Sequence, residues 1–299
     1  MLMSNKHHFV IGGHHVCIVF TQGQMNSMEL LPSFAPFAIG DDDHNGEEPF
    51  ITLTVNDEHR PTKDRILIRK FDTGNGDTIV YKLLNGGYEY IIRDTLNRDC
   101  CLLSADKNFR HCQCALNGNW NMRSFGLNDA LMLIYAFAGS YQKTTLIHAS
   151  CVRYDNKAYP FIAQSGTGKS THSSLWLKHI EGTDLINDDN PIVRIDTEGA
   201  VWLYGSPWSG KTPCYRNVKV RLGAITRIER APQNSIERLG PVKAFASMLP
   251  ACSSMKWDSD IYRRLGDAIT HIIETTPIYT LYCLPDEEAA RLCQKTIHQ

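Results

Sequence analysis

The sequence predicts a mixed α+β and α/β chain in two parts, a mostly antiparallel β domain over residues 1–125 and an α/β domain over residues 126–299. Three observations support this division. Short β-branched and aromatic runs alternate with Gly, Asn and Asp up to about residue 116. An apolar pattern of helical period follows. Beyond it, a strand-like run enters a glycine-rich turn that precedes a second helical pattern, an order typical of α/β units.

The composition is that of an ordinary globular chain. Among 299 residues, 42% are hydrophobic and 21% are charged, which excludes a chain dominated by disorder. Lys and Arg total 31 against 32 for Asp and Glu, so the formal net charge of −1 provides no basic field for nucleic acid or an anionic membrane. We therefore expect no nucleic-acid partner.

The first residues and the cysteines indicate a cytoplasmic location. Residues 1–8 lack the apolar core and cleavage site of a secretory signal. The chain has no run near the roughly 18 consecutive apolar residues of a membrane-spanning helix, so we expect no membrane partner. The ten cysteines are expected to be reduced and mostly buried.

The first half contains a series of short strand patterns. Residues 8–20 are β-branched and aromatic with a Gly pair, which predicts a strand with a bend or a tight hairpin. Because only turns separate the runs that follow, we expect an antiparallel meander over roughly residues 5–116. Those runs are Phe50–Val55, Arg65–Phe71, Asp77–Leu83, Tyr88–Arg93 and Cys100–Ser104.

The second half alternates helix and strand patterns. Apolar residues cover most of a helix surface between about residues 127 and 142, which predicts a buried helix that links the halves. We expect later helices near residues 169–180, 241–249, 259–275 and 287–296. The expected strands are Thr145–Tyr154, Ala158–Ala163, Asp184–Asn187, Ala200–Tyr204 and Ile278–Leu284.

The glycine-rich turn carries the clearest chemical motif. The run Ala-Gln-Ser-Gly-Thr-Gly-Lys-Ser over residues 163–170 fits the phosphate-loop pattern, with Ala in place of the first Gly. Gly166 and Gly168 would let backbone N–H groups form a nest for phosphate oxygens at the helix N-terminus. Lys169 can reach the β- and γ-phosphates, and the Ser170 hydroxyl is placed to ligate Mg²⁺. We therefore expect ATP and Mg²⁺, with nucleotide contacts from Ser165, Gly166, Thr167, Gly168, Lys169, Ser170 and Thr171.

An acidic pair follows the next predicted strand. One carboxylate of Asp188 and Asp189 could hold Mg²⁺, and the second could accept the proton of an attacking hydroxyl. The alternative is a solvated turn in which Asn190 and Pro191 end the strand.

Together these residues resemble a known family. His148, the loop at 163–170 and the pair Asp188–Asp189 are similar to the catalytic core of HPr kinase/phosphorylase, which is structurally related to phosphoenolpyruvate carboxykinase. The resemblance covers about residues 145–195. It implies that Lys169 and Ser170 bind phosphate and Mg²⁺, that Asp188 is the base toward a serine hydroxyl, that Asp189 lies at the metal and that His148 lies near the phosphates.

The chain also departs from that family. The family's Glu after the loop Lys-Ser is Thr171 here, and its later Glu-x-Arg-Gly-x-Gly signature has no counterpart in residues 205–231. The chain is more similar to divergent HPr-kinase-like proteins found beside peptide-modification systems, some of which phosphorylate a serine of a precursor peptide. Lys211 and Arg216 are further candidates to contact transferring phosphate, the alternative being a loop anchored by Trp208.

These observations lead to one expected function and two alternatives. We expect an ATP-dependent kinase that phosphorylates a serine of a peptide or protein. The first half would present this acceptor through an exposed strand edge, or serve only dimerisation or stability, and a homo-oligomer is possible. One alternative is a nucleotide-binding regulatory pseudo-kinase, which would not need Asp188. The other is a small carboxykinase-like enzyme acting on a C3–C4 acid.

Three other features are assigned to structure rather than chemistry. The acidic run at residues 40–48 lacks EF-hand spacing and predicts a solvated turn. Neighbouring histidines in a strand point to opposite faces, so the pairs at residues 7–8 and 14–15 do not predict a zinc site. The cysteines at positions 100, 101, 112 and 114 do not predict one either, because only the last two share a face.

Overall fold

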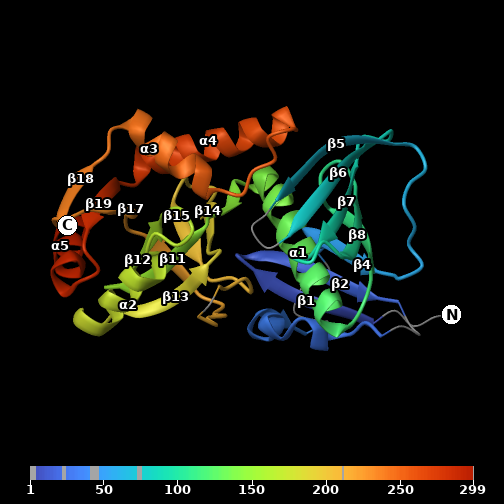
Figure 1. The fold of residues 1–299 in the computed structure, drawn as a ribbon, viewed down its shortest axis with the longest axis horizontal. Helices are drawn as coiled ribbons and strands as arrows, with labels where there is room; N and C mark the ends of the chain where they lie inside the picture. Colours follow the sequence, from blue (N-terminus) through green and yellow to red (C-terminus); the bar gives the residue numbers. More distant parts are fainter. Residues whose placement is uncertain (1–4, 22–24, 41–46, 73–75, 211, 299) are drawn as a thin grey trace. The chain divides into compact units, whose positions relative to one another are not determined.

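The chain forms two compact units, Met1–Ala138 and Gly139–Gln299, in a computed structural model (Figure 1). The structure describes residues 5–21, 25–40, 47–72, 76–210 and 212–298. Each unit contains one large sheet with parallel and antiparallel strand pairs, and helices accompany both sheets. The architecture is therefore mixed α/β.

The boundary between the units lies between Ala138 and Gly139, at the last residue of helix α1 (Trp120–Gly139), rather than after residue 125 as expected. The helix packs on the first sheet. The hydroxyl of Tyr135 donates a hydrogen bond of 2.8 Å to the carbonyl of Ile11, and the rings of Phe137 and Phe109 lie 5.3 Å apart. Burial of these side chains assigns α1 to the first unit, so it does not simply link the halves.

The first unit holds a nine-stranded sheet in the order β3-β1-β2-β4-β9-β8-β7-β6-β5. Two 3-10 helices, η1 (Met28–Leu30) and η2 (Pro32–Phe37), precede β3 in the chain. The strands are β1 (Asn5–Ile11), β2 (His14–Phe20), β3 (Ala38–Ile39), β4 (Ile51–Val55), β5 (Arg65–Asp72), β6 (Asp77–Leu83), β7 (Tyr88–Arg93), β8 (Asp99–Ala105) and β9 (His111–Leu116).

The expected hairpin and most of the expected strands are confirmed, but the sheet is not a simple meander. Gly12 and Gly13 form the turn between β1 and β2 with φ of 57° and 76°, which favours glycine. Strand β4 runs parallel to both of its neighbours, β2 and β9. The segment between β2 and β4 contains η1, η2 and β3, so β4 enters the sheet in the direction of β2.

The second unit holds a ten-stranded sheet. Most strands follow the order β10-β14-β15-β16-β12-β17-β19-β18, while β11 lies between β12 and β13. The strands are β10 (Thr144–Leu146), β11 (Ala149–Tyr154), β12 (Lys157–Ile162), β13 (Asp184–Asp189), β14 (Ile192–Ile195), β15 (Val201–Tyr204), β16 (Lys219–Leu222), β17 (Ile225–Arg230), β18 (Ser235–Arg238) and β19 (Ile278–Cys283). The helices are η3 (Ser140–Gln142), α2 (Lys169–His179), α3 (Pro241–Met248), η4 (Leu249–Ala251), α4 (Ser259–Thr275) and α5 (Glu287–Ile297).

The strand expected over Thr145–Tyr154 is divided into β10 and β11. Between them, Ile147 forms an isolated bridge with Cys252, and the N–H of His148 donates to the carbonyl of Ala251 at 2.6 Å. A partner about a hundred residues away in the chain thus interrupts the strand just before β11, where His148 lies.

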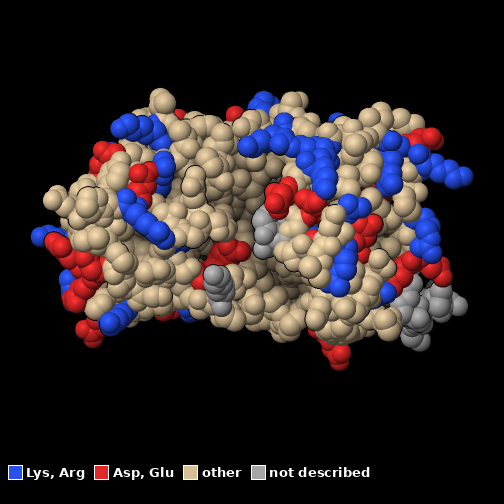
Figure 2. Space-filling model, in the orientation of Figure 1, with Lys and Arg blue, Asp and Glu red and all other residues tan. Residues whose placement is uncertain are grey.

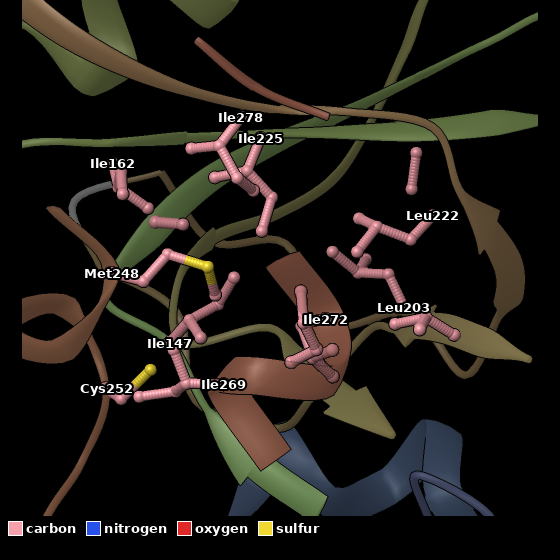
Figure 3. Close-up of a cluster of buried hydrophobic side chains, with 14 of the residues drawn as sticks. Ile147, Ile162, Leu203, Leu222, Ile225, Met248, Cys252, Ile269, Ile272 and Ile278 are labelled. Atoms are coloured by element: carbon pink, nitrogen blue, oxygen red, sulfur yellow. The ribbon is translucent and has the colours of Figure 1, made fainter. Parts of the chain in front are cut away.

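Helices cover both faces of the second sheet. Trp176 of α2 and Ala289 and Cys293 of α5 belong to one apolar cluster with Tyr159 and Phe161 of β12. A second apolar cluster lies on the opposite face and combines strand residues with α3 and α4 (Figure 3). In Figure 3, Ile269 and Ile272 of α4 lie among Ile147, Leu203, Ile225 and Ile278. Strand β12 is therefore packed on both faces, and α2 lies on one of them.

Basic and acidic side chains are interspersed on the face of the molecule drawn in Figure 2. All ten cysteines are free thiols, and all but Cys214 are buried, as expected. No helix in the described part of the chain combines the length and apolar character needed to cross a membrane. Residues 41–46 of the acidic run lie outside the described residues. Among the described residues, no three His, Cys, Asp or Glu side chains form a group that could hold a metal ion.

Candidate functional site

The glycine-rich turn joins the end of β12 to the first residue of α2. Gly166 and Gly168 adopt φ of 77° and 128°, conformations that L side chains rarely adopt. A Cβ added at either glycine would meet no atom within 4 Å. Conformation, not crowding by neighbouring atoms, therefore requires glycine here, and open space lies beside the turn. Ser165 and Thr171 are exposed, and Thr167 is half-buried.

Strand register brings the acidic pair to this turn. Ser150 of β11 pairs with Phe161 of β12 on one side and with Asp188 of β13 on the other, in both cases antiparallel. Ala149, one residue earlier, pairs with Ile162 and Asp189. The ends of β12 and β13 therefore lie level, and β13 extends two residues beyond its expected end at Asn187.

Asp188 is the more buried carboxylate of the pair, at 5% exposure. The Ser170 hydroxyl donates a hydrogen bond of 2.8 Å to its Oδ1. Its Oδ2 is buried and lacks a hydrogen-bond partner among the described residues. A buried carboxylate oxygen without a partner is costly unless a cation, a proton or a donor group satisfies it. The sequence suggested that Ser170 would share the metal with Asp189, whereas its contact here is with Asp188.

Asp189 contacts His148 instead. His148 Nδ1 lies 3.0 Å from Asp189 Oδ1, and the Asn190 amide donates to Asp189 Oδ2 at 2.8 Å. Both oxygens of this carboxylate are therefore engaged. The side chains of His148 and Asp189 are 42% and 32% exposed, so a molecule approaching the turn can reach them.

Lys169 is the first residue of α2 and is 9% exposed. Its Nζ donates to the carbonyl of Ala163 at 3.2 Å, which folds the side chain across the turn. Burial lowers the pKa of Lys169, and the carboxylates of Asp189 and Asp188 partly offset this effect. The two carboxylates are thus close enough to stabilise its charge.

We expected Arg216 at the glycine turn, but its side chain binds elsewhere. Its guanidinium donates to Asp184 Oδ2 at 2.7 Å and to the carbonyl of Leu185. Arg153 forms a bidentate pair with the same carboxylate, at 2.9 and 2.6 Å. Burial acts to raise the pKa of Asp184, but the two arginines outweigh it and hold that pKa below its usual value. Because Asp184 begins β13 while the acidic pair ends it, Arg216 is held at the other end of the strand. Lys211 lies outside the described residues.

Asn187 organises the segment after β15 and was not recognised from the sequence. It is fully buried, and its amide nitrogen lies within hydrogen-bond distance of three carbonyl oxygens, those of Ser206, Trp208 and Cys214. Its Oδ1 accepts from the backbone N–H groups of Asp189 and Asn190. Asn187 gives no local signal in the sequence, because the carbonyls near its amide nitrogen belong to residues about 20 to 30 positions away.

The same segment packs directly on the acidic pair. Gly210 N–H donates to the carbonyl of Asp188 at 2.7 Å, and Ser209 forms an isolated bridge with Asp189. A Cβ at Gly210 would lie 2.7 Å from the Asp188 carbonyl oxygen, so this contact requires glycine. Asn187 and Gly210 together hold the backbone of Asp188 and Asp189 in place through hydrogen bonds.

Neither a scan against models of known protein families nor a search of curated proteins gives a match for this chain. The geometry of the site therefore carries the functional argument.

The residues of the site suit a nucleotide with Mg²⁺. Mg²⁺ prefers hard oxygen ligands and is usually held by one or two carboxylates together with phosphates and water. Ser170 Oγ and the partly exposed carboxylate of Asp189 offer such oxygens. The open space beside Gly166 and Gly168, next to the N-terminus of α2, suits a phosphate group.

Proposed function

We propose that this protein is an ATP-dependent phosphotransferase that transfers the γ-phosphoryl group to a hydroxyl, with a serine of a peptide or protein as the acceptor. The observation that carries the proposal is the hydrogen bond from Ser170 to Asp188, beside a glycine turn and a buried lysine. A phosphate cradle alone would bind nucleotide. The acidic pair level with it adds the groups that phosphoryl transfer needs.

Each residue of the proposed site would have a defined task. Lys169 would place its charge on the β- and γ-phosphates, and the N–H groups of the turn would orient them. Ser170 and Asp189 would hold Mg²⁺, which would supply positive charge to neutralise the charge that develops on the phosphates. His148 would keep Asp189 oriented through their 3.0 Å contact.

Asp188 is the proposed base, because its Oδ2 alone in the pair has no partner among the described residues. It would accept the proton of the acceptor hydroxyl as that oxygen bonds to the γ-phosphorus. The bond from that phosphorus to the bridging oxygen breaks, and ADP leaves. General-base assistance of this kind contributes roughly 10²–10⁴ in rate.

The first unit, rather than the second, is proposed to bind the acceptor peptide. Strand β5 ends the nine-stranded sheet, and its Ile66, Leu67 and Ile68 are 59%, 60% and 41% exposed. An open strand edge can bind an extended segment by main-chain hydrogen bonds, with side chains on either face adding specificity.

Mass spectrometry of phosphoryl transfer tests the proposal. Incubation with Mg·ATP and serine-containing peptides encoded beside the gene, with free serine for comparison, should add one phosphoryl group to a peptide. ATP binding without transfer would instead support the regulatory pseudo-kinase. Phosphorylation of a C3–C4 acid would support the carboxykinase-like alternative.

Calorimetry tests the nucleotide site separately. Lys169→Ala should weaken Mg·ATP binding about tenfold or more, because a charge-assisted contact is removed. Lys178→Ala is the matched control, since Lys178 is an exposed residue of the same helix. Unchanged affinity in a folded Lys169→Ala protein would contradict the proposed site.

A further inference from the structure

Arg230 contacts the glycine turn from a distant part of the chain. Its Nε donates to the carbonyl of Thr167 at 3.0 Å, and a terminal nitrogen donates to the carbonyl of Gly166 at 2.6 Å. Two donors of one rigid guanidinium thus meet two successive carbonyls of the turn. Such a planar fork fixes both position and orientation.

The sheet explains why this side chain reaches the turn. Strand β17 runs parallel to β12, with Phe161 paired to Thr226 and Ile162 paired to Arg227. Strand β12 ends at Ile162, whereas β17 continues to Arg230 beside the turn. Strand β19 pairs with β17 along its whole length, up to Arg230 and Cys283, so the backbone that carries the guanidinium is held in the sheet.

The contact also shows on which side of the turn Arg230 lies. In a trans peptide unit, the C=O and the following N–H point in opposite directions. Since Arg230 binds the carbonyl of Thr167, the N–H of Gly168 faces away from the guanidinium. A phosphate received by that N–H would therefore lie on the other side of the turn from Arg230.

We propose that Arg230 is a positioning residue that braces the glycine turn from behind and holds the N–H of Gly168 ready for phosphate. This inference rests on the proposed nucleotide site. A brace acts on the turn itself, so it supports every ligand that places a phosphate there. A ligand of the γ-phosphate would instead affect ATP alone.

Nucleotide calorimetry separates these two roles. Arg230→Gln should weaken ADP and ATP binding by the same factor, about three- to tenfold, because hydrogen bonds that order the turn are lost. Arg230→Lys should restore part of the affinity, since one ammonium can reach one carbonyl. Arg227→Gln is the matched control: Arg227 lies on the same strand but pairs with Glu229 at 2.6 Å. Unchanged affinity for both nucleotides, or a loss for ATP alone, would overturn the brace.

Hydrogen exchange without nucleotide gives an independent test of the brace. Amides of residues 163–168 should exchange faster in Arg230→Gln than in the wild type or in Arg227→Gln. Equal exchange in all three proteins would overturn the inference. If the wild type binds neither ATP nor ADP but Arg230→Gln still exchanges faster, the brace is supported and the proposed nucleotide site is overturned.

Discussion

Ser170 donates a hydrogen bond of 2.8 Å to Oδ1 of Asp188, which joins the first turn of α2 to the end of β13. These residues lie on separate elements, and only β11 lies between β12 and β13 in the sheet. The contact therefore depends on the register of three strands. It leaves Oδ2 of the same carboxylate without a partner among the described residues.

The first prediction concerns the roles of the two carboxylates. Asp188→Asn keeps the shape but removes the base, so we expect kcat to fall roughly 10²–10⁴-fold while Mg·ATP affinity changes little. Asp189→Asn should mainly raise the Mg²⁺ concentration needed for half-maximal rate. Steady-state kinetics and calorimetry on both variants distinguish the roles. If Asp188→Asn retains the wild-type kcat, the base is Asp189 or His148.

The second prediction concerns Asn187. Asn187→Asp removes the amide donor that faces Ser206, Trp208 and Cys214, and it places a carboxyl group at a fully buried position. We expect the free energy of unfolding to fall by about 2–4 kcal/mol. Urea denaturation measures the change. Asn190→Asp, at a half-buried neighbour, is the control and should cost less; equal losses would contradict the central role of Asn187.

The sequence predicted correctly the helices and strands whose ends are marked by neighbouring residues, such as a helix cap or a turn. Helix α4 has its expected bounds, because Asp258 caps it through the N–H groups of Asp260 and Ile261 and apolar residues recur at helical spacing. Strands β6 and β7 also have their expected bounds, since turn residues flank them. The glycine turn and the acidic pair could likewise be located from the sequence.

Contacts between distant segments could not be predicted in this way. Arg216 was expected at the phosphates, but Asp184 holds it at the opposite end of β13. Asn187 and Arg230 gave no signal, because the carbonyls that they bind are distant from them in the sequence. The break between β10 and β11 depends on Cys252 in the same way.

The third prediction concerns the acceptor. If the edge of β5 presents a peptide, Leu67→Asp should raise the KM for the peptide about tenfold, because a charge replaces an exposed apolar contact. Affinity for Mg·ATP should stay unchanged. Leu84→Asp is the control, since Leu84 is 75% exposed but lies outside β5. Equal KM values in the two variants would show that β5 does not present the acceptor.

The fourth prediction concerns stability below neutral pH. His172 is 2% exposed and accepts a hydrogen bond of 3.1 Å from the indole of Trp176, and burial lowers its pKa from 6.5 to about 4. The folded protein therefore keeps this ring neutral, while the unfolded chain binds a proton below pH 6.5. The stability contributed by neutral His172 is complete above pH 6.5 and is lost as the pH falls toward 4, with a loss of about 2 kcal/mol at pH 5. His172→Gln keeps an acceptor for the indole but does not titrate, so urea unfolding at pH 7.5 and pH 5 should show a loss smaller by about that amount. Other titrating groups are common to both proteins, and equal losses would contradict the role of His172.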